Sequence, residues 1–265
     1  MATSDLFLIL FLFVVLQPFL RQKRLEWLRV RQIGEIQKGR HSRVITLIHR
    51  QVSMAFFGIP LMRYIDINDS ERIIRAIHLT EDDTPIDLII HAPGGLALAA
   101  LQIARALKAH PAKVTVHVPH YAMSGATLIA LAADEIVMDN HAMLGPVDPQ
   151  VGMYPAASVL AAVGRKDPNE LDDMTLILAD VAEKAIAQTK SAVKDLLLEQ
   201  MPEDEADRTA HTLTTGTWTH DHPLMAETAR LLGLPVVEGL DPLIYDLMHF
   251  YPQPVRQQAA VEYVP

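Results

Sequence analysis

The amino-acid sequence predicts an α/β protein built around a mostly parallel β-sheet. Short, β-branched apolar runs of strand length alternate with helical stretches in the first half of the chain. Two glycine-containing turns, at residues 91–95 and 120–125, each follow one of these strands and precede a helix. This order of strand, turn, helix and strand is typical of βαβ units, whose crossovers place parallel strands side by side.

The individual elements follow from hydrophobic periodicity and from the capping and breaking residues that bound each segment. Strands are expected at residues 43–49, 86–91, 113–118, 135–138 and 235–237. Helices are expected at residues 25–39, 70–78, 96–109, 124–133, 171–200, 203–213 and 226–232. Ser70 is the expected N-cap of the second of these helices. Residues 216–222 are expected to form a loop, and the Pro/Gln-rich tail at residues 251–265 is expected to be irregular.

The N-terminus carries an apolar run. Residues 6–20 (LFLILFLFVVLQPFL) are almost wholly apolar, but a membrane span wants about 20 such residues, and Pro18 lies near the end of the run. No basic residue precedes the run and no Ala-x-Ala site follows it, which argues against a cleaved signal peptide. We therefore expect an uncleaved transmembrane anchor at residues 1–22. A buried or interfacial helix with a basic edge is the alternative.

Basic residues crowd the segment after the apolar run, between Arg21 and Arg50, where only Glu26 and Glu35 oppose them. Because Lys and Arg mark the cytoplasmic flank of a span, this asymmetry predicts a single-pass protein with its N-terminus outside and its bulk in the cytoplasm. The expected organisation is an anchor at residues 1–22, a basic juxtamembrane helix and linker at 23–42, a folded domain at 43–250 and a tail at 251–265.

Composition excludes several classes of function. The net charge of −9 argues against a general affinity for nucleic acid, which needs clustered Lys and Arg to displace counterions. The chain has no cysteine, which excludes disulfides, thiolate nucleophiles and cysteine-based metal sites. The pair His220 and His222 lacks a third ligand at metal-binding spacing, so no metal or other cofactor is expected.

Two turns lie where parallel strands are expected to end, which is the edge of an α/β sheet that holds ligands. In the first, Pro93-Gly94-Gly95 leads into a helix, so its N–H groups suit an oxyanion, a phosphate or a tight turn alone. In the second, Ser124 precedes Gly125 at a helix start. A serine there is either an N-cap or a nucleophile with the next N–H beside it.

A family resemblance rests on three segments, which are HAPGG at residues 91–95, VPHYAMSGATLIALAADEIVMD at 118–139 and LGPVDPQ at 144–150. Their order and spacing resemble the Clp-protease/crotonase superfamily. They are more similar to the signal peptide peptidase A-type and NfeD-associated membrane serine proteases. They are most similar to the serine dehydrogenase proteinase family, and this resemblance covers residue 43 to the C-terminus.

The resemblance implies a fold of repeated β-β-α units with a serine protease site. Ser124 is then the nucleophile, and the N–H groups of Gly95 and Gly125 form the oxyanion hole. Asp148 is expected to fix its own turn by accepting backbone hydrogen bonds. Residues expected to line the site are Gly94, His120, Met123 and Ala126, the last standing where the family usually has a second glycine.

The resemblance also bears on the base that activates Ser124. The histidine of the Clp proteases corresponds to Gly145 here, so the resemblance implies the lysine that the related membrane proteases use instead. Alignment of residues 194–197 (KDLL) with their long helix places that lysine on Lys184. A lysine base requires burial that lowers its pKa by several units. The reserve bases are Lys190, Lys166 and His141.

These observations predict a membrane-anchored serine protease that cleaves protein or peptide substrates through an acyl-enzyme, with a Ser-Lys dyad. The resemblance also implies a homo-oligomer. One alternative is a non-catalytic, membrane-tethered oligomeric scaffold. The other is a crotonase-like acyl-CoA thioester enzyme that uses the same oxyanion hole.

Overall fold

The computed structural model describes residues 2–50, 52–53, 60–61 and 63–251. Its centre is a five-stranded sheet in which every neighbouring pair is parallel. The strand order is β1 (Arg43–Ile48), β4 (Ile86–His91), β5 (Val114–Val118), β7 (Glu135–Met138) and β11 (Val236–Glu238). The mostly parallel α/β sheet predicted from the sequence is confirmed, with each strand within one residue of its expected bounds.

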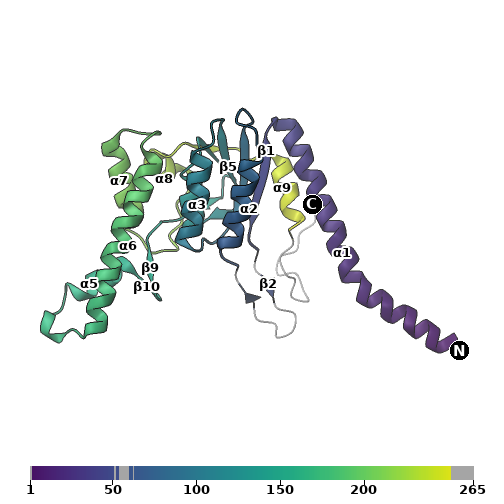
Figure 1. The fold of residues 1–265 in the computed structure, drawn as a ribbon, viewed down its shortest axis with the longest axis horizontal. Coiled ribbons are helices and arrows are strands. Elements are labelled where there is room, and N and C mark those ends of the chain that lie inside the picture. The colour runs from purple at the N-terminus through teal and green to yellow at the C-terminus, as the bar shows by residue number, and fades with distance from the viewer. Residues whose placement is uncertain (1, 51, 54–59, 62, 252–265) are drawn as a thin grey trace.

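Helices cover both faces of this sheet (Figure 1). On one face, α2 (Ile67–His78), α3 (Ala97–Lys108) and α4 (Gly125–Ala130) contribute to a core that includes Leu88 and Ile90 of β4. On the other face, Ile89 packs with residues of α1 (Ala2–Arg40) and α9 (Pro242–His249). Because side chains alternate along a strand, the apolar residues of β4, which is buried along its whole length, contribute to both cores.

A second, smaller ladder of short strands runs beside the main sheet. Its strands are β6 (Tyr121–Ala122) and β8 (Met143–Leu144), which pair in parallel. Isolated bridges extend the ladder from Ala122 to Ala92 on one side and from Leu144 to Leu224 on the other. Successive units thus place one strand in the main sheet and a short one in the ladder, as expected for repeated β-β-α units.

The remaining elements include a pair of helices that projects from the main body. Helix α5 (Ala156–Val163) packs on the N-terminal half of α6 (Asp173–Leu197) through Val159, Ala179 and Ala182, and the two project from the body (Figure 1). The C-terminal half of α6 joins the main core through Val193 and Leu197. The hairpin β9 (Gln150–Val151)–β10 (Tyr154–Pro155) and α7 (Glu203–Thr214) contact this helix pair, and η1 (Pro168–Glu170) lies between α5 and α6 in the chain. α8 (Ala226–Leu231) contacts β8 and β11, and the antiparallel pair β2 (Val52–Ser53)–β3 (Pro60–Leu61) lies away from α5 and α6 (Figure 1).

The N-terminal helix is longer than the sequence predicted. α1 is continuous from Ala2 to Arg40 and passes through Pro18, so this proline does not end the helix. Its last turns pack against α9 through Ile33 and Ile36, whereas its N-terminal end lies away from the body (Figure 1). Within the described part of the chain, no helix has an apolar stretch sufficient to cross a membrane. Of the irregular tail expected at residues 251–265, residues 252–265 lie outside the described residues.

Two local expectations differ from the structure. α2 begins at Ile67, because Asp66 and Asp69 form a capping box in which each carboxylate accepts the backbone N–H of the other residue. Ser70 is therefore not the N-cap but a buried residue whose hydroxyl contacts Gln102. The short helices α5 and α9 were not expected. For α9 the signal was present, because Asp241 caps the helix and proline follows at its first position.

A buried polar network joins the end of α1 to the sheet. Asp87 of β4 is 3% exposed and accepts hydrogen bonds from Ser42 at 2.5 Å and Arg40 at 2.8 Å. It also lies 2.6 Å from Nε2 of His117. Burial opposes ionisation, but the hydrogen bonds from His117, Arg40 and Ser42 outweigh it and hold the pKa of Asp87 well below its usual range.

We predict that Asp87→Asn destabilises the protein by about 3 kcal/mol, because an amide offers one acceptor oxygen where the carboxylate uses two. Chemical denaturation should show this loss at neutral pH. Since the pKa of Asp87 is lowered on folding, its contribution is present above the unfolded-state pKa and disappears as pH falls, so the mutant and wild type should converge in acid. Asp204→Asn, which breaks the exposed pair with Arg208, is the control and should change stability by less than about 1 kcal/mol.

Candidate active site

Ser124 occupies a strained turn between β6 and α4. Its φ is 51° and its ψ is −118°, and among the described residues His41 is the one other non-glycine residue with positive φ. Its side chain makes no capping hydrogen bond to the helix that it precedes. Such backbone strain costs about 1–3 kcal/mol and occurs at nucleophile turns, where it exposes the hydroxyl above a helix N-terminus. This geometry disfavours the simple N-cap interpretation of Ser124.

The glycine turn after β4 lies directly against Ser124. A Cβ on Gly94, whose φ is +104°, would lie 2.8 Å from the Cβ of Ser124. A Cβ on Gly95 would lie 2.3 Å from the backbone of Ile65, and a Cβ on Gly125 would lie 3.4 Å from the Gly95 nitrogen. Among the described backbone hydrogen bonds, none has the N–H of Gly95 or Gly125 as donor. Two neighbouring N–H groups are thus available for an oxyanion beside Ser124.

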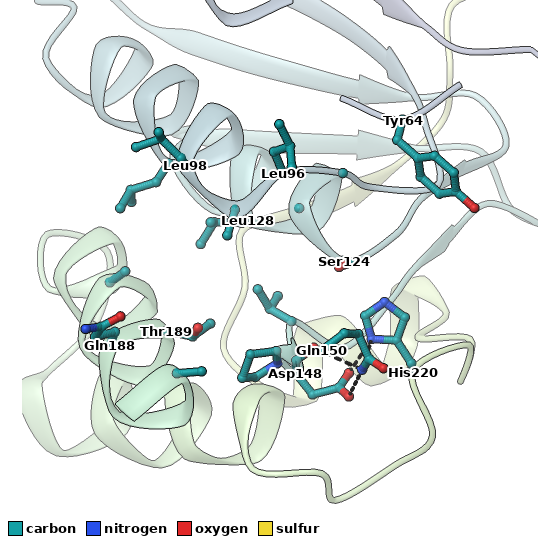
Figure 2. A pocket seen from close by; sticks show the side chains of 18 of the residues that line it. Tyr64, Leu96, Leu98, Ser124, Leu128, Asp148, Gln150, Gln188, Thr189 and His220 are labelled. Carbon is teal, nitrogen blue, oxygen red and sulfur yellow. Dashed lines mark hydrogen bonds and ion pairs between the residues drawn. The ribbon is translucent and has the colours of Figure 1, made fainter. Parts of the chain in front are cut away.

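Ser124 opens into a cavity of about 820 Å³ between the main body and α6. Apolar residues of α3 and α4, including Leu98 and Leu128, form one wall (Figure 2). Gln188 and Thr189 of α6 lie across from them (Figure 2). The other lining residues are Tyr64, Pro93, Gly95, Leu96, Ala97, Leu101, Gly125, Val147, Asp148, Pro149, Gln150, Ala185, Ala192 and His220.

An ion pair lies in the same cavity as Ser124. Nδ1 of His220 is 2.7 Å from Oδ1 of Asp148, whose side chain is 2% exposed. The other carboxylate oxygen of Asp148 accepts a hydrogen bond from Nε2 of Gln150 at 2.9 Å. In the view of Figure 2 the imidazole lies between the Asp148 carboxylate and Ser124. The hydrogen bond with Asp148 raises the pKa of His220 above its ordinary value, against the opposing effect of burial.

Sequence reasoning missed this pair. Asp148 was expected to cap its own turn, but its carboxylate instead contacts His220 and Gln150. His220 was considered for a metal site, whereas no group of three or more His, Asp or Glu side chains suited to a metal occurs in the described residues. The order of elements along the chain was the available signal. Asp148 follows the strands β7 and β8, and Ser124 follows the strands β5 and β6. Because β8 pairs with β6, residues after these two strands can lie near each other.

The lysines expected as bases lie elsewhere. The side chain of Lys184 is 65% exposed and its Nζ is 2.5 Å from a carboxylate oxygen of Asp180. Lys190 pairs with Asp207 at 3.0 Å, and Lys166 is exposed. His141 is 91% exposed. None of these four residues lines the cavity that contains Ser124.

Some of the residues expected at the site line the cavity and others do not. Gly95, Ser124 and Gly125 line the cavity, whereas Gly94, His120, Met123 and Ala126 are outside its lining. Ala126 is fully buried and Met123 packs on Gly145, where a Cβ would lie 2.5 Å from the methionine methyl. The ring of His120 contacts His91 and Tyr245 instead. Gly94 nevertheless shapes the site through its contact with Ser124.

Comparison with known proteins places the chain in a family. The model of the ClpP-like SDH-type serine proteinases matches residues 1–265. The uncharacterized protein MJ0137 of Methanocaldococcus jannaschii is 52% identical over 263 residues, which cover 99% of this chain and 92% of the relative. The uncharacterized protein MJ1495 of the same organism is 50% identical over 266 residues, which cover 100% of this chain and 91% of the relative.

Solved structures of the 1510-N membrane-bound stomatin-specific protease are also similar. A serine-to-alanine mutant has a TM-score of 0.46 at 21% identity, covering 71% of this chain and 79% of that chain. A lysine-to-alanine mutant in complex with a substrate peptide has a TM-score of 0.45 at 21% identity, covering 67% and 72%. Because the family model spans the whole chain, this protein belongs to the ClpP-like SDH-type serine proteinase family.

Proposed function

We propose that this chain is a serine peptidase with Ser124 as nucleophile, His220 as general base and Asp148 as the group that orients His220. The observation that carries the proposal is the Asp148–His220 pair in the same cavity as the strained Ser124. Because Nδ1 of the imidazole faces the carboxylate, its Nδ1–H donates to Asp148 and Nε2 is left as the proton acceptor. Family membership supports the reaction class.

In the proposed reaction, Nε2 of His220 takes the proton of Ser124 while Oγ attacks the peptide carbonyl carbon. The carbonyl oxygen gains negative charge and is held by the N–H groups of Gly95 and Gly125. The C–N bond then breaks, and His220 returns the proton to the leaving amine. Water, activated by His220 in the same way, attacks the acyl ester on Ser124, releasing the acid and restoring the hydroxyl.

A Ser124–Lys184 dyad is the competing mechanism. A lysine base needs an environment that disfavours its charged form, which in practice means burial away from carboxylates. Lys184 is instead exposed and paired with Asp180, and the residues of α6 that do line the cavity include Ala185, Gln188 and Thr189. The described geometry therefore favours His220, and the dyad stays an alternative that labelling can test.

We predict that a fluorophosphonate probe labels Ser124 and that Ser124→Ala abolishes the label. His220→Ala should slow labelling by at least about 100-fold, because it removes the base. Lys184→Ala should label at the wild-type rate within about twofold, because it leaves the His220–Asp148 pair intact. Peptide mass spectrometry locates the label. If His220→Ala is labelled at the wild-type rate and Lys184→Ala is not labelled, the Ser124–Lys184 dyad is the better mechanism. If the wild type itself is not labelled, the scaffold and acyl-CoA alternatives are favoured.

We predict that kcat/KM for a peptide rises with pH through an apparent pKa above the usual histidine value of about 6.5, because only neutral His220 accepts a proton. Asp148→Asn removes the carboxylate that raises the pKa of His220 and that holds the proton of its imidazole on Nδ1. It should shift the profile to lower pH and reduce kcat by about 10³–10⁴-fold. Asp204→Asn, at an exposed pair, should leave both unchanged. An unmoved profile in Asp148→Asn would remove His220 from the mechanism.

We also propose that the N-terminal part of α1 anchors the protein to a membrane, with the bulk of the chain on the cytoplasmic side. The apolar run at residues 6–20, the basic residues that follow and the position of this helix end away from the body support the proposal. Each Lys or Arg near an anionic surface adds about 1 kcal/mol of attraction. The homo-oligomer that the family resemblance implies stays a prediction.

We predict that the full-length protein resists extraction from membranes by alkaline carbonate, because the apolar residues at the N-terminal end of α1 would be held by the hydrocarbon core and not by charge. Leu12→Lys places a charge in the apolar run and should release the protein. Leu231→Lys, at an exposed leucine of α8, is the matched control and should not. Extraction of the wild type by high salt alone would instead indicate an interfacial helix.

A further inference from the structure

The face of α6 that lines the active-site cavity continues beyond it as an exposed apolar stripe. Ala185 and Gln188 line the cavity. Toward the helix N-terminus, the same face carries Val181, Ile177 and Met174, which are 43%, 57% and 71% exposed. These five positions are spaced three or four residues apart, which places them in one row along the helix.

The opposite wall of the cavity is apolar and open as well. Leu96 and Leu98 line the cavity and are 54% and 62% exposed. In Figure 2 Leu98 lies across the cavity from Gln188 of α6. Exposed apolar residues that adjoin one another in this way mark binding surfaces. The cavity and the stripe together form one apolar surface that begins beside Ser124.

One ion pair lies beside the stripe. Asp180 precedes Val181, Lys184 precedes Ala185, and these two charged side chains pair with each other at 2.5 Å. The helix is held in place by its other faces, through Ala179 and Ala182 against α5 and through Val193 in the main core. The stripe therefore does not serve the packing of α6.

We infer that the site takes an extended apolar peptide segment, with one side chain in the cavity and the flanking residues along Val181, Ile177 and Met174. This inference rests on the proposed peptidase function. The row from Met174 to Gln188 is about 21 Å long at 1.5 Å per residue. An extended peptide rises about 3.3 Å per residue, so roughly six substrate residues lie along the row. Continuity with the nucleophile's cavity favours a substrate over a second copy of this chain.

The test compares two quenched fluorescent peptides of ten residues that share the residues at the scissile bond. One has Leu, Val and Ile in its flanks and the other has Ser and Asn. The detergent-solubilised wild type should cleave the apolar-flanked peptide with at least a 10-fold higher kcat/KM. Ile177→Asp and Val181→Asp should bring the two values close together, while fluorophosphonate labelling of Ser124 shows that the site is folded. Leu231→Asp is the matched control and should retain the full preference.

Each outcome is distinguishable from failure of the proposed function. A labelled wild type that cleaves both peptides equally well overturns the inference and leaves the peptidase intact. An unlabelled wild type removes the peptidase, and the inference with it. If Ile177→Asp keeps the flank preference but sediments as a smaller species than the wild type, the stripe belongs to an interface between copies of this chain, which also overturns the inference.

Discussion

The contact between the glycine turn and Ser124 is the constraint on which the candidate site depends. The bridge between Ala92 and Ala122 fixes the register of the two segments that contain them. The turns that follow these segments, at Gly94 and at Ser124, must then lie within van der Waals distance of each other. A Cβ on Gly94 would lie 2.9 Å from the carbonyl oxygen of Met123 and closer still to Ser124, so no larger residue fits. The same absence of side chains leaves the N–H of Gly95 open toward Ser124.

The short ladder extends this constraint to the proposed base. β8 follows β6 in the ladder, so the turn after Leu144 emerges beside the turn that holds Ser124. The bridge from Leu144 to Leu224 places the loop that precedes Leu224 beside β8. In this loop His220 contacts Asp148, which is 72 residues away in the sequence. The ladder therefore brings together the N–H groups of Gly95 and Gly125, Ser124 and the Asp148–His220 pair from separate parts of the chain. A protein with this sheet but without the ladder would lack the site.

Sequence reasoning could reach the sheet, most helices and Ser124, because each depends on local signals such as β-branched runs, caps and a serine before glycine. It could not reach the base that we propose. In sequence, Lys184 has small, apolar neighbours that suit burial, but Ala182 of the same segment packs on α5 and turns the lysine toward solvent. Which face of a long helix is buried depends on partners distant in the chain, and here one partner, α5, had itself not been predicted. His220 was missed for the same reason, because only tertiary contacts bring it to Asp148.

α6 connects the chemistry to the choice of substrate. Its C-terminal half is fixed in the main core by Val193 and Leu197, so the cavity wall opposite Ser124 is rigidly placed. Its N-terminal half projects with α5 and leaves Ile177 exposed along the same face. Polar residues at these exposed positions would disturb no packing of the described chain, so folding does not require this face to be apolar. An apolar face in line with Ser124 fits the extended apolar peptide that we infer, because one such ligand would contact both the cavity and the exposed residues of α6.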